Sequence, residues 1–358
     1  MKRVQGRHVR KTSAARRWLM ACVAALLAGV AAAASAACAQ TQPAPTGQLA
    51  SLRETLDAGG WIARMHQASM RHDYSGTFVV LSANGTLTSA RIWHVCEGQR
   101  QIERVEALSG KPRVIFRRDS EMRTFLPQER VVLSELRDAP VTFPRVPQAS
   151  DVQPSQHYTV QVMGNDRVAG RDTDILAFIP RDGWRFGYRI WVDKASGLLV
   201  KMQTLDGERV LEQAAFSELA FEVPVLLEHM ARQMDAMDGY RLVSVPTQQT
   251  TARAEGWQIS EAVGGFVTQG CFKKNSYQRQ SNKSRPVLQC IFSDGMATLS
   301  LFMEPYNAQQ HPATARMISV GATQVAGQKV LGDTWVTAVG EVPQRTLRRF
   351  IEGLGRHP

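Results

Sequence analysis

The cysteines are the residues whose spacing suggests chemistry most clearly. Cys271 and Cys290 flank a polar segment that is rich in Lys and Arg, whereas Cys96 stands alone far upstream. Two cysteines on either side of a turn suit a disulfide between neighbouring strands, and the sequence favours this pairing over two free thiols. Cys96 is expected to be a small buried hydrophobic residue. No C-x-x-C motif or histidine pair accompanies the cysteines, so no zinc site is predicted.

The motifs of common catalytic sites are missing from the sequence. It contains no G-x-S-x-G, G-x-x-x-x-G-K-[ST] or H-E-x-x-H pattern. His66, His72 and His94 lie close together in the chain but lack the i, i+4 spacing of a metal site on a helix. The carboxylates are scattered, and nothing marks two of them as a pair. The sequence therefore predicts no catalytic residue, no metal site and no cofactor, and it favours a binding protein over an enzyme.

The N-terminus has the order of a secretory signal peptide. Residues 1–17 contain seven Lys or Arg and no acid, residues 18–47 contain no charge, and Ala37-Cys38-Ala39 is a small-x-small site. This order predicts a cleaved signal peptide over residues 1–39, followed by a flexible leader over 40–50. An uncleaved membrane anchor is the alternative, but the apolar run is rich in Ala and would insert weakly. The signal suits a Gram-negative bacterium, so the mature chain is expected in the periplasm.

Removal of this peptide changes the charge balance. The whole chain has 43 Lys and Arg against 32 Asp and Glu, which gives a formal net charge of +11. Without residues 1–39 the formal charge falls to +4, because seven cations leave with them. A nucleic-acid partner therefore loses its main support, and no nucleic-acid-binding motif replaces it.

The elements that follow are mostly strands. A helix is predicted over 58–70, and Asn84-Gly85 predicts a hairpin between 75–82 and 88–95. The connections are too short for crossovers, so the sheet is expected to be antiparallel. Further strands are predicted at 112–118, 122–127, 130–136, 157–164 and 173–180, with three more inside 188–213. Four prolines between Pro140 and Pro154 predict a long irregular loop.

A change of period divides the chain into two parts. Residues 223–237 have a helical pattern, with Leu226, Met230, Met234 and Met237 on one side, as in a packed linker helix or a Met-rich docking surface. The predicted domains are therefore 51–222 and 247–358, with a helical linker over 223–246. Strands are predicted in the second domain at 256–260, 265–273, 287–292 and 296–303, and a final helix begins near Pro343.

The stretch 188–213 predicts two unlike faces. One face, the Tyr188 face, combines Tyr188, Ile190 and Val192 with Leu198, Val200 and Met202, and it is expected to be core. The other, the Trp191 face, mixes apolar and basic side chains, as a partner-binding surface or a contact between domains would. Its partner-surface candidates are Arg189, Trp191, Leu199, Lys201 and Leu211.

A second set of residues suggests either a cavity for a lipid or ordinary core. These side chains are aromatic and lie on several of the predicted strands. The candidates for a lipid groove are Phe78, Trp93, Phe116, Phe125, Trp184 and Phe186.

In the order and spacing of several segments, the mature chain resembles the RseB/MucB family, the periplasmic regulators of the envelope-stress sigma factor. YSGTFVVLSANGTLTSARIWHV is similar to the family's first hairpin, and VGEVPQRTLRRFIEGL is similar to its ending. Its most characteristic block is matched by the turn Arg167–Arg171, the strand Tyr188–Asp193 and the hairpin Asp206–Gln213. The pair Cys271 and Cys290 and the basic segment between them depart from the family pattern.

The resemblance implies an α+β fold and no catalysis. It implies an N-terminal unclosed antiparallel β half-barrel with covering helices, as in the lipoprotein carriers LolA and LolB, and a smaller C-terminal α/β domain. It also implies a protein that binds the periplasmic region of a membrane-spanning anti-sigma factor and shields it from regulated proteolysis. A lipid or a lipoprotein would act as the signal.

Two questions stay open at the level of sequence. A periplasmic lipid or lipoprotein carrier of the LolA type is the alternative function, although a carrier needs no second domain and residues 247–358 count against it. The oligomeric state is not fixed by the sequence, and a homo-oligomer is compatible with it.

Overall fold

The computed structural model describes residues 56–98, 100–136, 153–221, 225–244, 246–260, 263–276 and 285–357. The predicted signal peptide, the leader and nearly all of the proline-rich segment 140–154 lie outside these residues. Within the described ranges, no helix is long and apolar enough to cross a membrane. All of these residues belong to one compact unit.

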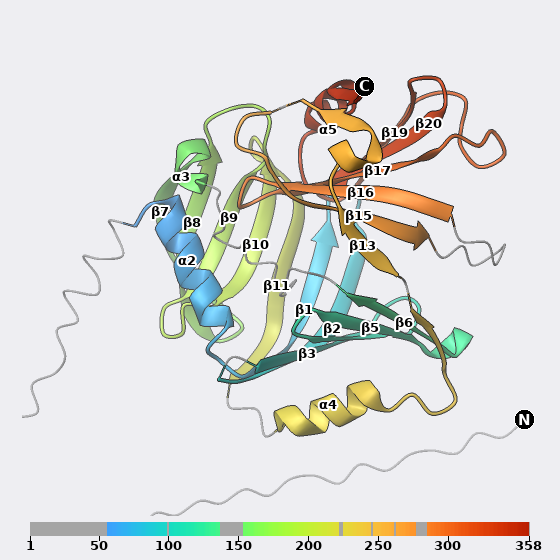
Figure 1. Cartoon of the computed structure of the whole chain (residues 1–358). Helices are drawn as coiled ribbons and strands as arrows, with labels where there is room; N and C mark the ends of the chain where they lie inside the picture. Colours follow the sequence, from blue (N-terminus) through green and yellow to red (C-terminus); the bar gives the residue numbers. More distant parts are fainter. Residues whose placement is uncertain are drawn as a thin grey trace, which may run out of the picture. The chain divides into compact units, whose positions relative to one another are not determined.

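Among the described residues, a large sheet of 12 strands is built from the chain between Tyr74 and Ser244 (Figure 1). Its order is β12-β6-β5-β4-β3-β2-β1-β11-β10-β9-β8-β7. The first six strands are β1 (Tyr74–Ser82), β2 (Leu87–Glu97), β3 (Arg100–Ala107), β4 (Val114–Arg118), β5 (Glu121–Leu126) and β6 (Val131–Leu136). The others are β7 (Tyr158–Val168), β8 (Arg171–Pro180), β9 (Gly187–Asp193), β10 (Leu199–Asp206), β11 (Arg209–Phe221) and β12 (Arg241–Ser244).

The pairing in this sheet is antiparallel except at one edge. Short turns join consecutive strands and dictate antiparallel pairing, but β12 runs parallel to β6. Among the described residues β7 and β12 are edge strands, which confirms the predicted unclosed antiparallel sheet. The sequence pattern did not indicate β3, because most of its side chains are charged or polar. It also missed β12, so the predicted helical linker 223–246 ends in a strand that extends the large sheet.

Among the described residues, three α-helices and one 3-10 helix accompany the large sheet. The first, α2 (Ala58–Ser69), confirms the predicted helix, and its N-terminus is capped by the Asp57 side chain, which accepts from the Gly60 N–H. It buries Trp61, Ile62 and Met65 against the Tyr188 face. The short α3 (Pro154–His157) precedes β7, and the 3-10 helix η1 (Pro127–Glu129) joins β5 to β6.

The third helix, α4 (Leu227–Asp235), packs on the region of β2 and β3. Met230 and Met234 are 1% and 0% exposed in a cluster with Phe116 and Phe125, as expected of a packed helix. The predicted inward position of Leu226 is wrong, because this residue is the N-cap and is 74% exposed. Leu227 takes its place in the cluster.

A second sheet of seven strands contains the C-terminal part, in the order β13-β15-β16-β17-β20-β19-β18. Its strands are β13 (Thr247–Thr250), β15 (Val267–Ser276), β16 (Arg285–Ser293), β17 (Thr298–Pro305), β18 (Arg316–Val320), β19 (Thr323–Val330) and β20 (Thr334–Gly340). Beside it lie η2 (Arg253–Glu255), α5 (Gln344–Glu352) and a small sheet of β14 (Trp257–Ile259) and β21 (Leu354–Arg356). The helix α5 packs on β19 and β20, whereas β18 and β19 were not predicted.

The disulfide predicted from the cysteine spacing is present. Cys271 on β15 pairs directly with Cys290 on β16, and their Cα atoms are 4.1 Å apart. Both cysteines are buried in the core cluster between the sheet and α5. The bridge therefore ties two neighbouring strands together beneath the C-terminal helix.

A β-bulge changes which side chains share a face in the stretch 188–213. The register between β9 and β10 shifts between Leu199 and Lys201. One extra residue in a strand breaks the alternation of faces. Leu199 therefore packs with the Tyr188 face, whereas Leu198 and Val200 pack in the cluster that contains Trp191. The predicted assignment of these three residues is wrong for this reason.

We expect Trp191→Ala to lower the free energy of unfolding by about 3–5 kcal/mol. The side chain is 4% exposed in its hydrophobic cluster, and its Nε1 donates to Asp166 Oδ2 at 3.0 Å. The exposed Arg189 on the same strand supplies the control, since Arg189→Ala should change stability by no more than about 0.5 kcal/mol. Denaturant titration measures both values, and equal small losses would contradict the assignment of Trp191 to the core.

Candidate functional site

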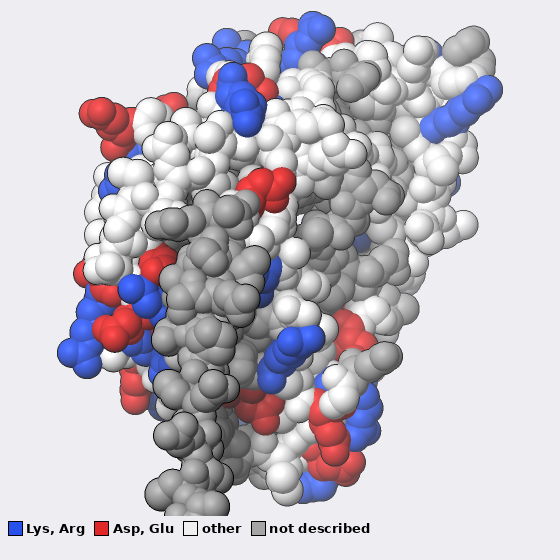
Figure 2. Space-filling model, turned by 90° about the vertical axis from the view of Figure 1, so that its left-hand side faces the viewer, with Lys and Arg blue, Asp and Glu red and all other residues white. Residues whose placement is uncertain are grey.

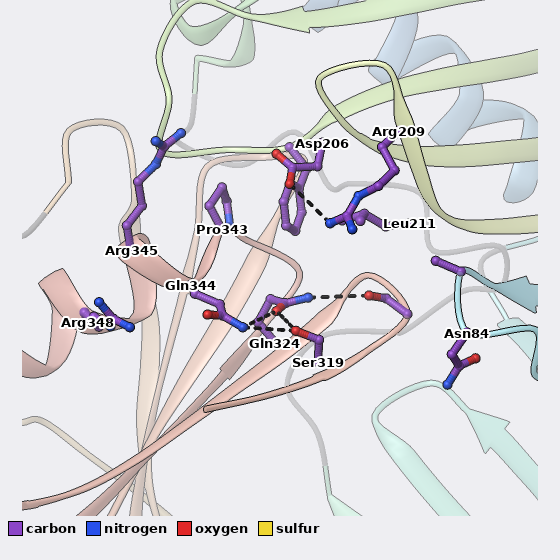
Figure 3. A pocket seen from close by; sticks show the side chains of 13 residues that line it. Asn84, Asp206, Arg209, Leu211, Ser319, Gln324, Pro343, Gln344, Arg345 and Arg348 are labelled. Carbon is purple, nitrogen blue, oxygen red and sulfur yellow. Dashed lines mark hydrogen bonds and ion pairs between the residues drawn. The ribbon is translucent and has the colours of Figure 1, made fainter. Parts of the chain in front are cut away.

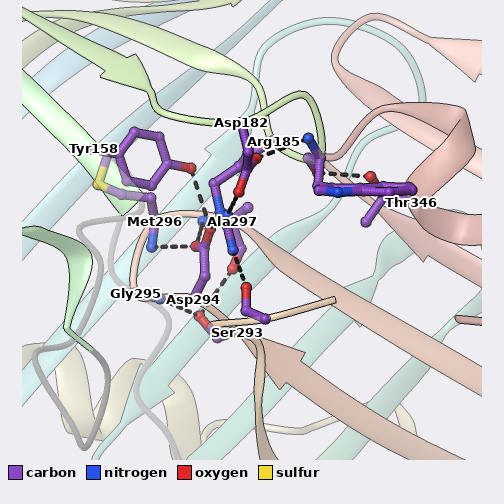
Figure 4. A network of polar contacts seen from close by, with 11 residues as sticks. Tyr158, Asp182, Arg185, Ser293, Asp294, Gly295, Met296, Ala297 and Thr346 are labelled. Carbon is purple, nitrogen blue, oxygen red and sulfur yellow. Dashed lines mark hydrogen bonds and ion pairs between the residues drawn. The ribbon is translucent and has the colours of Figure 1, made fainter. Parts of the chain in front are cut away.

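A buried ion pair joins the two sheets. Arg185 lies in the loop between β8 and β9, and its Nε donates to Asp294 Oδ2 at 2.7 Å (Figure 4). Asp294 belongs to the turn between β16 and β17 in the other sheet. Both side chains are 0% exposed. A charge buried to this degree is costly unless its partners satisfy it, so the surrounding contacts decide whether the pair is stable.

The surroundings satisfy both charges. Asp294 Oδ1 accepts from the backbone N–H groups of Met296 and Ala297 at 2.9 and 2.8 Å, and Oδ2 also accepts from the Tyr158 hydroxyl at 3.3 Å (Figure 4). Arg185 Nη2 donates to the Gly264 carbonyl at 2.6 Å, and Nη1 pairs with Asp182. The guanidinium lies 5.1 Å from the centre of the Phe266 ring. The pair is thus held by groups from both sheets.

The same loop also holds the start of α5. Thr346 Oγ1 donates to the Trp184 carbonyl at 2.6 Å, and Arg345 Nε donates to the Gly183 carbonyl. Thr346 is 0% exposed. We call the loop 181–186, together with Tyr158, Asp294 and Thr346, the junction. Its position explains why a six-residue connection between two strands contains two arginines and two aromatic side chains.

A cleft of about 610 Å³ lies beside the junction (Figure 3). Its volume is within the range of about 300–1,000 Å³ that is usual for ligand sites. One wall comes from the large sheet, at the β1–β2 and β10–β11 turns, and the other comes from the β18–β19 hairpin and α5. The lining residues are Ala83, Asn84, Phe186, Asp206, Arg209, Leu211, Ser319, Gly321, Gln324, Pro343, Gln344, Arg345 and Arg348.

The charges of the cleft are mainly positive. Arg209, Arg345 and Arg348 face a single lining acid, Asp206. By contrast, basic and acidic side chains are interspersed among the described residues on the face shown in Figure 2. The cleft therefore differs in charge from that mixed face.

Two carboxylates from different sheets interact next to the cleft. Burial and the nearby charge of Glu341 raise the pKa of Glu212, and hydrogen bonds from Ser82 Oγ and the Ala322 N–H lower it in part. The Ser82 hydroxyl lies 3.2 Å from Glu212 Oε2. Gly321 sits against this carboxylate with φ of +60°, and a Cβ there would collide with it. The turn between β18 and β19 is therefore fitted closely onto Glu212.

The lipid-groove candidates do not gather in one cavity among the described residues. Phe116 and Phe125 pack beneath α4, with Trp93 at the edge of the same cluster. Phe78 lies in a second cluster. Phe186 packs with Leu211 and Ala322, and Trp184 is 36% exposed in the junction. A lipid role for these six residues stays a prediction.

The partner-surface candidates are mostly buried. Trp191, Leu199 and Leu211 are 4%, 1% and 4% exposed. Lys201 Nζ lies 4.0 Å from the centre of the Trp191 ring, and Arg189 is the one candidate that is exposed. Leu211 contacts the second sheet through Ala322, so the alternative of a domain contact describes it. These residues are not an open docking face.

Two further residues noted in the sequence for their type are Cys96 and His94. Cys96 is half-buried, not the buried hydrophobic residue expected, and its Sγ donates to Asp73 Oδ1 at 3.3 Å. Burial and Asp73 raise the pKa of this thiol to about 11, which keeps it protonated. Burial lowers the pKa of His94 to about 4. In the described part of the chain no three His, Cys, Asp or Glu side chains gather as metal ligands would.

The junction was not predicted from the sequence. Asp294 lies between the predicted strands 287–292 and 296–303, and Arg185 lies between the predicted strand 173–180 and those inside 188–213, in connections without a motif. The available signal was an Arg between Trp184 and Phe186, since a cation between two aromatic residues in a short loop suggests burial.

The fold and the site together define the class of this protein. It is an α+β protein in which a large open sheet and a smaller antiparallel sheet meet at a buried ion pair beside a cationic cleft. The models of the MucB/RseB N-terminal domain and the MucB/RseB C-terminal domain match residues 57–237 and 251–355. The chain therefore belongs to the MucB/RseB family.

Relatives cover more than four-fifths of the chain. The sigma factor AlgU regulatory protein MucB of Pseudomonas aeruginosa is 27% identical over 303 residues, which is 83% of this chain and 90% of MucB. The sigma-E factor regulatory protein RseB of Haemophilus influenzae is 25% identical over 300 residues, 84% of this chain and 91% of RseB. The crystal structure of MucB in complex with MucA(peri) matches with a TM-score of 0.62 at 25% identity, and the match covers 84% of this chain and 100% of that one.

Breaking the buried ion pair should destabilise the protein strongly. Arg185→Met leaves Asp294 buried without its cation, and we expect a loss of about 3–5 kcal/mol in the free energy of unfolding. The exposed Arg181 in the same loop provides the control, Arg181→Met. Denaturant titration measures both. An equal effect of the two changes would show that the pair is not a special constraint.

The raised pKa of Glu212 predicts that acid stabilises this contact. The folded state holds the proton more tightly than the unfolded chain, so ionised Glu212 lowers the free energy of unfolding at neutral pH. The penalty shrinks as the pH falls through the folded-state pKa and disappears below the ordinary value of 4.5. Glu212→Gln should therefore stabilise the protein at neutral pH and lose this advantage in acid.

Thermal unfolding across this pH range tests the expectation. Glu218→Gln, at an exposed position of the same strand, is the matched control. A gain from Glu212→Gln that does not depend on pH would contradict the assigned role of the carboxylate.

Proposed function

We propose that this protein binds the periplasmic region of a membrane-spanning anti-sigma factor and shields it from regulated proteolysis. The observation that carries the proposal is the match, over 84% of this chain, to MucB in complex with MucA(peri). The relatives named as regulators of sigma factors AlgU and sigma-E support it as well. The proposed action takes place in the periplasm, where the N-terminal signal would direct the chain.

The mechanism requires occlusion alone and no catalysis. A bound segment is not available to a protease, so protection follows from the fraction of the anti-sigma factor that is bound. A signal can release the segment only if it binds better to a state that holds the segment less well. We propose a lipid or a lipoprotein as this signal.

The packing supports a specific site for such a ligand. Phe116 and Phe125 lie under Met230 and Met234 of α4, so an acyl chain could reach these rings only by displacing that helix. Movement of α4 would expose a continuous apolar surface on the large sheet. A simple lipid carrier is the alternative function, but it gives no role to the second sheet and its buried junction.

Protection from proteolysis tests the function directly. The mature protein, mixed with the periplasmic domain of its own organism's anti-sigma factor, should slow cleavage by the protease that begins its degradation. The expected slowing increases with protein concentration and saturates, because binding follows mass action. Unchanged cleavage together with extraction of acylated lipoprotein from vesicles would favour the carrier instead.

A further inference from the structure

The arginines of the cleft have few acidic partners. Arg209 is 71% exposed and meets Asp206 only at 3.5 Å. Arg345 donates to the Gly183 carbonyl and has no acidic partner among the described residues. Arg348 is exposed and has no hydrogen bond or ion pair with the residues that the structure describes. Three cations are thus arranged around one cleft with a single lining acid.

The elements hold these cations in fixed places. Arg345 and Arg348 are three residues apart on α5, so they lie on the same side of the helix, and Leu347, Phe350 and Ile351 anchor its other side. Arg209 is the first residue of β11, directly after the tight turn from β10, in the other sheet. Figure 3 shows Arg209 on one side of the cleft and the two helix arginines on the other.

The floor of the cleft is polar and already ordered. Gln344 Nε2 donates to Ser319 Oγ at 3.0 Å and to Gln324 Oε1 at 3.2 Å. The apolar lining residues Phe186 and Leu211 are 3% and 4% exposed, so they offer little surface to a ligand. The lining also includes apolar surface, so the three cations and these polar groups, and not a lack of apolar wall, are what match a chain with carboxylates and backbone amides.

We propose that this cleft binds an acidic, extended segment of the protein partner, with carboxylates on Arg209, Arg345 and Arg348. Cations on opposite walls match several carboxylates spread along a peptide better than one compact anionic group. The inference rests on the proposed function, since it assigns the partner a place of contact. It also explains why the cleft is built from both sheets: a segment bound there contacts the two parts at once.

The experiment compares charge reversals inside and outside the cleft. The mature protein, Arg209→Glu, Arg348→Glu and the control Arg253→Glu, at an exposed position outside the cleft, are titrated with the labelled periplasmic domain of the anti-sigma factor. Each cleft reversal should weaken binding about tenfold, and the control should leave it unchanged. Binding to the mature protein should also weaken with added salt. Arg345 is left intact because it supports the junction.

A second probe tests the cleft proposal independently of the proposed function. It is a labelled peptide of alternating Glu and Val, with a Gln and Val peptide for comparison. If the anti-sigma domain binds all variants equally, the function stands and the cleft is wrong. If the anti-sigma domain does not bind at all, the proposed function fails. The cleft is still supported in that case if the mature protein binds the Glu peptide and not the Gln peptide, and if both cleft reversals lose binding to the Glu peptide.

A lipid source for the charge is tested in the same assay. Vesicles of phosphatidylglycerol that bind the mature protein, lose binding in the cleft reversals and outcompete the Glu peptide would overturn the assignment to a peptide. Melting curves of each variant ensure that a loss of binding is not a loss of fold.

Discussion

The ion pair between Arg185 and Asp294 is the constraint on which the arrangement of the two sheets depends. It has no access to water, and each partner comes from a different sheet. If the sheets separated by the width of a water molecule, the two charges would lose each other as partners. Burying an unpaired charge costs several kcal/mol, so the separated charges could not stay buried. The hydrogen bond from Tyr158 to Asp294 and the one from Arg185 to the Gly264 carbonyl would also break if the sheets separated. The contact between the two sheets is therefore expected to be rigid, unlike a loosely packed surface between domains.

Local features of the fold were predictable, and features of long range were not. The hairpin at Asn84-Gly85, the helix after Asp57 and the disulfide follow from residues near one another in the chain. The bulge beside Lys201 could not be predicted, since its cause is the pairing of two strands and not the composition of either one. The same limit applies to Trp191, whose burial depends on neighbours from other strands.

The candidate site shows this limit more strongly. Arg185 and Asp294 are 109 residues apart, and neither segment contains a pattern that predicts their pairing. The cleft likewise combines turns of the large sheet with α5 near the C-terminus. A family resemblance could indicate the function, but only the structure could bring these side chains together. The aromatic residues were easier to notice in the sequence, and they proved to be divided among separate packed clusters.

The path of the chain between the sheets has a mechanical consequence. Ser244 ends β12 at the edge of the large sheet, and Thr247 begins β13 at the edge of the second one. Only two residues separate these strands, and one of them is Pro246, whose ring fixes φ. A connection of two residues allows the two strands little movement relative to one another. Any force that turns one sheet against the other would load the two four-residue ladders on either side of this link, β12 on β6 and β13 on β15.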